Sequence, residues 1–117
     1  GRGGPNYSAE YVADVVVTAE KAGVKPSLMI DCSHGNSSKD PERQPVVLED
    51  VLKQVADGND HIHSVMIESN LNAGNQKVPV DLDELEYGVS ITDGCLGWAA
   101  TEKALREAHA ALAGRSQ

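Results

Sequence analysis

The sequence predicts an α/β fold with parallel strands, and three observations support this prediction. Short aliphatic runs alternate with longer segments whose apolar residues recur at helical spacing, a pattern typical of βα units with right-handed crossovers. Apolar residues make up 40% of the 117 positions, mostly Val, Ala, Leu and Ile, and Phe is absent. That composition suits buried parallel strands covered by helices. Only two strands are clear, so we expect a sheet that is incomplete in this chain alone.

The first helix and the first strand are predicted by local signals. Ser8 is a suitable N-cap, and the apolar stripe that follows it ends at Gly23, a residue that commonly terminates helices. The short apolar run 27–30 then predicts a strand, because it changes abruptly to polar residues at Asp31. We expect this strand to lie in the sheet with its polar end at one edge.

A second helix and a second strand follow in the same order. After a polar loop at 35–44, Pro45 suits the first helical position. The apolar stripe behind it stops at Gly58 and consists of Val47, Leu48, Val51, Leu52 and Val55. The run 63–67 predicts the second strand, which ends at Glu68.

The last third of the chain is less regular. Residues 72–86 are acidic and show neither helical nor strand periodicity, so they predict a long loop. Residues 89–93 predict a weak strand or an extended part of that loop. Thr101 is the predicted N-cap of a final helix, and Gly114 lies beyond its end.

Composition excludes several classes of function. A formal net charge of -8 argues against nucleic acid and anionic membranes as partners, since both need clustered Lys and Arg. No apolar run reaches the length of a membrane span, and no signal peptide opens the chain. Cys32 and Cys95 form no disulfide framework, which indicates a reducing cytoplasm. The first residues lack an initiator Met, and we expect the chain to begin within a longer protein.

Polar side chains follow both predicted strands where each strand ends. His34 comes shortly after the first strand, Glu68 directly after the second, and Asp93 after the weak segment 89–93. Parallel α/β folds place their sites at the carboxyl ends of strands. One imidazole and two carboxylates suit a divalent metal such as Mn, Fe, Co or Zn, with positions left open for a substrate oxygen.

The spacing alone leaves alternatives open for these residues. His34 is equally explained as a hydrogen-bonded histidine at a strand end, and Glu68 as a solvated loop acid. Strand alternation places Cys32 on the face of His34 and Asp31 on the other. We interpret Cys32 as a packing residue and Asp31 as a possible hydrogen-bond partner that supports a ligand of the site. Arg2 by itself is a terminal surface residue, but after a strand it would be another strand-end group able to bind an anion.

The remaining histidines have no comparable setting. Two of them, His61 and His63, flank the start of the second strand, and His109 lies on the last helix. We interpret all three as structural or solvent-facing residues.

Five strings of residues occur in an order that resembles one enzyme family. They are RGGPNYS at 2–8, MIDCSHGNSSK at 29–39, MIES at 66–69, GNQ at 74–76 and YGVSITDGCLGW at 87–98. Together they resemble the C-terminal third of class I 3-deoxy-D-arabino-heptulosonate-7-phosphate (DAHP) synthase, also called phospho-2-dehydro-3-deoxyheptonate aldolase. The resemblance covers nearly the whole chain, although the loops at 4–6 and 72–86 depart from the family's pattern.

The resemblance implies a (β/α)8 TIM barrel, of which residues 1–117 are the C-terminal portion, its last βα units. It implies that His34, Glu68 and Asp93 bind the metal with an upstream Cys that this chain lacks. It also implies that Arg2 and His34 bind phosphoenolpyruvate, and that His34 takes a catalytic part by moving a proton or ordering water. The expected partners are the remainder of the barrel and further copies in a homo-oligomer.

The implied reaction joins phosphoenolpyruvate to erythrose 4-phosphate and releases phosphate, the first step of the shikimate pathway. In such a reaction the metal polarises the aldehyde of erythrose 4-phosphate. Two other hypotheses are a different metal enzyme on the same barrel, such as a hydrolase or an octulosonate 8-phosphate synthase, and an inert structural fragment. The SITDGCLGW string disfavours the first of these, and we expect the isolated chain to lack synthase activity.

Overall fold

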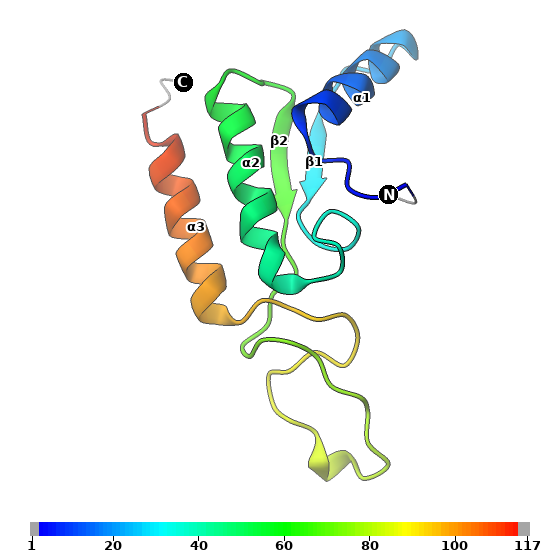
Figure 1. Ribbon diagram of the computed structural model, residues 1–117, viewed down its shortest axis with the longest axis vertical. Helices are drawn as coiled ribbons and strands as arrows, with labels where there is room; N and C mark the ends of the chain where they lie inside the picture. Colours follow the sequence, from blue (N-terminus) through cyan, green and yellow to red (C-terminus); the bar gives the residue numbers. More distant parts are fainter. Residues whose placement is uncertain (1–2, 115–117) are drawn as a thin grey trace.

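The computed structural model describes residues 3–114, and Figure 1 shows their arrangement. The elements in chain order are α1 (Ala9–Lys21), β1 (Leu28–Asp31), η1 (Pro41–Arg43), α2 (Gln44–Ala56), β2 (Ile62–Met66), η2 (Leu82–Glu84) and α3 (Trp98–Leu112). The predicted order of helix, strand, helix, strand, long loop and helix is confirmed. The two short 3-10 helices, η1 and η2, carry no periodic signal and were not expected.

The two strands pair in parallel, as the alternation of strands and helices predicts. Ile30 lies opposite Val65, and Asp31 lies opposite Met66. The carboxyl ends of β1 and β2 therefore meet at the same edge of the sheet. In Figure 1, α2 lies between α3 and β2, and α1 lies near β1 at the other side. The described part of the chain is thus an α/β unit with two parallel strands.

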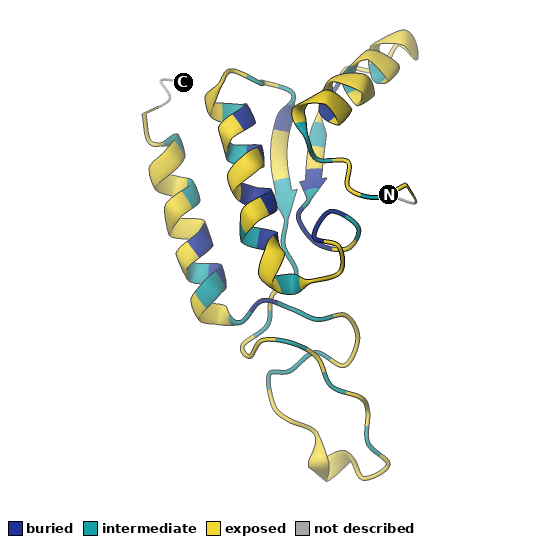
Figure 2. Cartoon of the chain, viewed as in Figure 1, coloured by how far each residue is buried: buried dark blue, intermediate teal, exposed yellow. Residues whose placement is uncertain are grey.

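The aliphatic core lies between the strands and the helices. Its buried members are Val12, Ile30, Cys32, Val47, Leu48, Val51, Ile62 and Ala104. Figure 2 shows the buried turns of α2 on the side that faces the strands. Cys32 is fully buried among these residues, which confirms its interpretation as a packing residue.

One prediction about local structure was wrong. The last helix begins at Trp98 with Gly97 as its N-cap, so Thr101 lies inside the helix, where its hydroxyl donates to the Gly97 carbonyl at 3.0 Å. Of the two alternatives for residues 89–93, a weak strand or a part of the loop, the structure has the loop, in which Ser90 makes an isolated bridge to Asn75. Thr101 also makes a tertiary contact from inside the helix, because its hydroxyl lies 2.6 Å from that of Ser69, next to Glu68.

The long connection between β2 and α3 extends away from the body of the molecule, with η2 near its tip (Figure 1). The described residues accordingly span 53 × 33 × 19 Å. Among the described residues no helix combines the length and apolar character needed to cross a membrane.

Candidate metal centre

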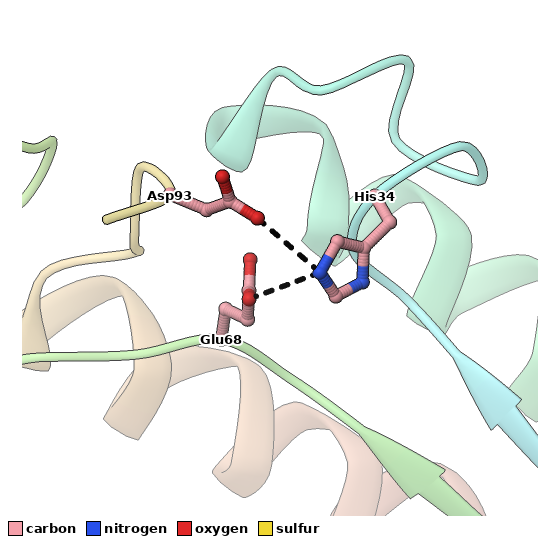
Figure 3. A group of neighbouring side chains, drawn as sticks. All are labelled: His34, Glu68 and Asp93. Atoms are coloured by element: carbon pink, nitrogen blue, oxygen red, sulfur yellow. Dashed lines mark ion pairs between the residues drawn. The ribbon is translucent and has the colours of Figure 1, made fainter.

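The three residues predicted as metal ligands come together in the structure. His34 lies in the loop after β1, Glu68 lies just beyond β2, and Asp93 lies in the connection that leads to α3 (Figure 3). One potential ligand atom from each side chain lies within 4.8 Å of the others. His34 Nε2 is 3.2 Å from Glu68 Oε1 and 3.4 Å from Asp93 Oδ2. Arg2, the fourth predicted site residue, lies outside the described residues.

The orientation of His34 depends on the end of β1. The strand stops at Asp31, and His34 has a φ of 51°, in the left-handed region. His34 Nδ1 is 2.8 Å from Asp31 Oδ2, and the Ser33 hydroxyl donates to Asp31 Oδ1 at 2.6 Å. Strand alternation placed Asp31 on the opposite face from His34, and this was wrong because the alternation no longer applies after the strand has ended. The interpretation of Asp31 as a partner of the site agrees with the contact. Asp31 holds the imidazole with Nε2 toward Glu68 and Asp93.

The contacts between His34, Asp31 and their neighbours shift the pKa of both side chains. The hydrogen bond to Asp31 raises the pKa of His34 above its usual value of 6.5, and the charges of Glu68 and Asp93 act in the same direction against a desolvation effect. Burial raises the pKa of Asp31, but its hydrogen bonds with Ser33 and His34 outweigh burial and the net pKa is lowered. Asp31 is therefore an ionised acceptor that favours a proton on the Nδ1 of His34.

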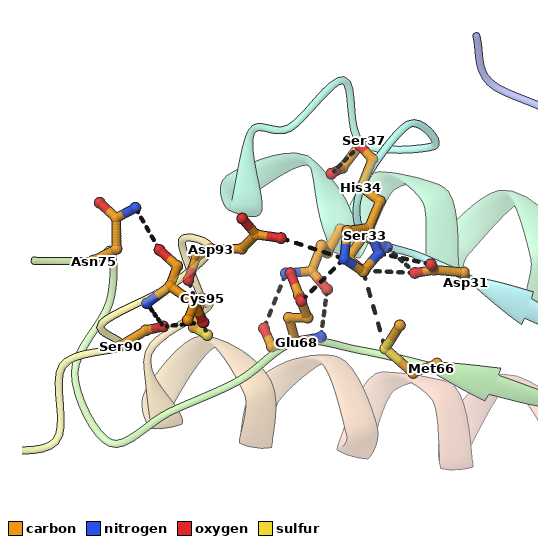
Figure 4. A network of polar contacts seen from close by, with 12 residues as sticks. Asp31, Ser33, His34, Ser37, Met66, Glu68, Asn75, Ser90, Asp93 and Cys95 are labelled. Carbon is orange, nitrogen blue, oxygen red and sulfur yellow. Dashed lines mark hydrogen bonds and ion pairs between the residues drawn. The ribbon is translucent and has the colours of Figure 1, made fainter. Parts of the chain in front are cut away.

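Glu68 and Asp93 are held by backbone contacts between their two segments. The Leu96 N–H donates to the Glu68 carbonyl at 3.0 Å, and the Asn70 N–H donates to the Leu96 carbonyl at 2.9 Å. Close to Asp93, the Asn75 side chain donates to the Thr92 carbonyl at 2.9 Å (Figure 4). Because Leu96 is fully buried, it anchors the loop that presents Asp93 next to Glu68.

Sequence reasoning missed one residue that holds Glu68. The buried side chain of Gln44 pairs with both backbone groups of Glu68, at 2.9 and 2.8 Å. Gln44 stands at the boundary of a polar loop and a helix, and no motif or period marks it. What marks Gln44 in the structure is that its polar side chain is wholly buried. Burial cannot be seen in the sequence, so sequence reasoning could not select this residue.

The site opens into a cavity of about 310 Å³, which is lined by His34, Glu68 and Asp93. Lys39 and Ser37 also line it, from the loop that follows His34. Imidazole and carboxylate donors of this kind suit a borderline divalent cation, and the half-exposed side chains leave room for further ligands. The donor set therefore fits a catalytic metal with open coordination positions better than a closed structural one.

The other histidines lie away from this site, as predicted. His63 Nδ1 is 3.2 Å from the Ser27 hydroxyl, His61 Nε2 is 3.7 Å from Asp60, and His109 is exposed on α3. None of the three lines the cavity.

Fold and site together define a parallel α/β unit with a candidate divalent-metal centre at the carboxyl ends of its strands. Residues 1–106 match the model of the DAHP synthetase I family. The chain therefore belongs to the DAHP synthetase I family, as the resemblance of its motifs implied.

Individual relatives agree with this assignment. The Tyr-sensitive phospho-2-dehydro-3-deoxyheptonate aldolase of Escherichia coli is 52% identical over 116 residues, which are 97% of this chain and 33% of that protein. The tyrosine-inhibited enzyme of Schizosaccharomyces pombe is 47% identical over 120 residues, 100% of this chain and 32% of that protein. The chain thus spans about one third of the length of the curated relatives it matches.

A solved structure shares the fold. The phospho-2-dehydro-3-deoxyheptonate aldolase of Francisella tularensis SCHU S4 superposes with a TM-score of 0.91 at 43% identity, over 100% of this chain and 33% of that chain. The α/β unit with two parallel strands is therefore one third of a larger fold in that protein.

Proposed function

We propose that this chain is the C-terminal third of a single (β/α)8 barrel domain that condenses phosphoenolpyruvate with erythrose 4-phosphate to give DAHP and phosphate. The observation that carries the proposal is the cluster of His34, Glu68 and Asp93 within a chain whose first 106 residues match the DAHP synthetase I family. This reaction is the first step of the shikimate pathway, and its setting in this proposal is the cytoplasm.

His34, Glu68 and Asp93 are the proposed ligands of one divalent metal ion, with Mn, Fe, Co and Zn as the candidates. A metal held there supplies Lewis-acid polarisation to the aldehyde oxygen of erythrose 4-phosphate. The 310 Å³ cavity beside the three side chains gives the substrates access to that position.

The residues of the chain have separate tasks in this proposal. Arg2 offsets the negative charge of phosphoenolpyruvate. His34, held through Nδ1 by Asp31, lies beside phosphoenolpyruvate and takes part in proton movement or in ordering water. The enzyme also needs a further metal ligand and the phosphate-binding residues, which come from the remainder of the barrel, and we expect the whole to assemble as a homo-oligomer.

The test measures DAHP formation and phosphate release by the intact protein that contains this chain. Activity is expected with erythrose 4-phosphate, and arabinose 5-phosphate, the acceptor in octulosonate 8-phosphate synthesis, should be a poor replacement. His34→Ala should abolish turnover, as should removal of metal with EDTA, and added Mn²⁺ should restore activity only in the EDTA-treated wild type. Full turnover by His34→Ala would remove His34 from the site.

A further inference from the structure

Gln44 is a wholly buried polar residue that contacts the candidate metal centre without offering it a ligand. It is the first residue of α2 and has 0% of its surface exposed. Its Nε2 donates to the Glu68 carbonyl at 2.9 Å, and the Glu68 N–H donates to its Oε1 at 2.8 Å. The carboxamide therefore pairs with both backbone polar groups of a single residue, and both of its own polar atoms are satisfied.

This pairing replaces strand contacts at a point where the sheet has ended. The last paired residues of the two strands are Asp31 and Met66, and Glu68 lies two residues beyond that pair. A neighbouring strand would use one N–H and one carbonyl to fix the peptide plane of the residue opposite. Gln44 supplies the same two groups from a side chain, and so fixes the direction in which the Glu68 side chain leaves the backbone.

Gln44 also connects the two halves of the site. The polar loop that begins with His34 leads through η1 directly into Gln44 at the start of α2. The paired amide therefore joins the segment that presents His34 to the segment that presents Glu68. The Leu96 N–H donates to the same Glu68 carbonyl at 3.0 Å, so Glu68 is held from the α2 side and from the Asp93 side at once.

We propose that Gln44 is a positioning residue of the metal centre, which holds the backbone of Glu68 so that its carboxylate meets His34 and Asp93. The inference rests on the proposed function in one respect, the role of Glu68 as a metal ligand. Loss of a group that orients a metal ligand typically weakens metal binding by about 10–100-fold. The effect should be much larger than for a buried Gln that is not connected to the site.

The chain offers such a control in the same helix. Gln54, near the end of α2, is also buried, with 9% of its surface exposed, and its Nε2 donates to the Tyr7 carbonyl at 2.7 Å and to Asp50 at 2.6 Å. Gln44→Met and Gln54→Met make the same change in the same element. Gln44→Glu is a variant of the same shape. Because an ionised carboxylate would be buried against the Glu68 carbonyl, the new side chain should bind a proton, accept from the Glu68 N–H and donate to that carbonyl through its O–H.

The intact protein and each variant are freed of metal and titrated with Mn²⁺ alone. The visible spectrum of bound Co²⁺ and the thermal unfolding of each metal-free protein are also recorded. We expect the Mn²⁺ dissociation constant to rise about 10–100-fold in Gln44→Met and by a smaller factor in Gln44→Glu, with an altered Co²⁺ spectrum. Gln54→Met should lower thermal stability but keep the wild-type dissociation constant and spectrum. If Gln44→Met does not fold, the Mn²⁺ dissociation constants of Gln44→Glu and Gln54→Met are compared instead. A higher constant for Gln44→Glu then supports the positioning role, and equal constants overturn it.

Glu68→Ala separates failure of the inference from failure of the proposed function. If Glu68→Ala weakens Mn²⁺ binding while both Gln44 variants bind as the wild type does, the positioning role is overturned and the metal site stands. Equal losses of affinity in the Gln44 and Gln54 variants would also overturn it, because the effect would then be one of general stability. If Glu68→Ala binds Mn²⁺ with unchanged affinity, the proposed metal site itself is wrong.

Discussion

At the scale of single residues, the backbone of His34 decides the geometry of the site. Its φ of 51° lies in a region that residues other than Gly occupy uncommonly, although His is among those that tolerate it. This conformation allows one ring nitrogen to face Asp31 while the other faces Glu68 and Asp93. The imidazole therefore lies between three carboxylates, which favour its protonated form.

The metal-free protein should lose a small part of its stability as the pH rises above neutrality. The pKa of His34 is raised above 6.5 in the folded state, so its contribution is complete below about pH 6.5 and is lost as the pH rises through the raised pKa. The side chain is half-exposed and water screens its ion pairs, so the loss should be at most about 1 kcal/mol. Urea unfolding in EDTA at a series of pH values measures it. His34→Gln should remove this pH dependence, and an unchanged profile would contradict the assignment.

The two cysteines should differ in reactivity. Burial raises the pKa of Cys32 to about 12, and the thiolate is the reactive form, whereas Cys95 is partly exposed. In the native protein a thiol reagent such as DTNB should modify Cys95 quickly and Cys32 only after unfolding. Mass spectrometry of the labelled protein identifies the modified residue. Fast modification of native Cys32 would show that the core around it opens readily.

The candidate site could be predicted from the sequence only as far as its ligands. His34 and Glu68 follow strand ends, and the motif around Asp93 is specific, so all three could be selected before the structure. Asp31 could be selected as a partner of the site, but the geometry of its contact with His34 could not be predicted, since it requires the left-handed turn after the strand. Gln44 could not be selected either, because its role depends on which backbone lies 2.9 Å from its side chain.

At the scale of elements, α2 supplies the largest share of the core, and its periodicity predicts which residues do so. Leu48 is buried, with 3% of its surface exposed, and Val46 is exposed at 55%. The stripe with helical spacing identified Leu48 as a core residue before the structure. The last helix was harder to delimit, because Gly97 caps it without a side chain and a plausible cap, Thr101, stands one turn later.

Truncation of Leu48 should therefore destabilise the protein far more than truncation of its neighbour on α2. Leu48→Ala removes buried methyl groups and leaves a cavity, a change that costs about 2–5 kcal/mol. Val46→Ala removes an exposed side chain and should change stability by roughly 0.5 kcal/mol or less. Denaturant unfolding of the two variants measures the difference. Equal effects would mean that the Leu48 face of α2 does not lie in the core.

At the scale of the whole molecule, charge links the site to stability. The chain has a formal net charge of -8, and the centre brings two carboxylates to within 3.4 Å of one imidazole nitrogen. A bound divalent cation offsets this concentration of negative charge. Because the three proposed ligands come from three segments, binding should also hold those segments together.

Metal should accordingly stabilise the folded state in a concentration-dependent way. At a free Mn²⁺ concentration of one hundred times the dissociation constant, the gain should be about 2.7 kcal/mol. Thermal unfolding with and without EDTA measures it in the intact protein. Asp93→Asn should reduce the gain, while Asp60→Asn, which changes an acid near an unrelated histidine, should leave it unchanged. The same gain in both variants would place the metal elsewhere.

When the chain is alone in solution, the edges of its two-stranded sheet are open to other chains. The sheet of the described residues contains only β1 and β2, so each strand has one edge without a strand partner within residues 3–114. Met29 in β1 is exposed at 64%, and Val15 and Val17 on α1 are exposed as well. Unpaired strand edges beside exposed apolar side chains favour pairing with another chain.

The isolated chain should therefore self-associate, and sedimentation at increasing concentration measures this. Met29→Lys places a charge on the open strand and should shift the equilibrium toward the monomer. Val80→Lys makes the same change on an exposed residue of the long connection between β2 and α3, and should have little effect if the sheet is the interface. A stronger effect of Val80→Lys would move the interface to that connection. A compact, stable monomer at every concentration would contradict self-association altogether, and would show that two parallel strands with three helices suffice for a soluble unit.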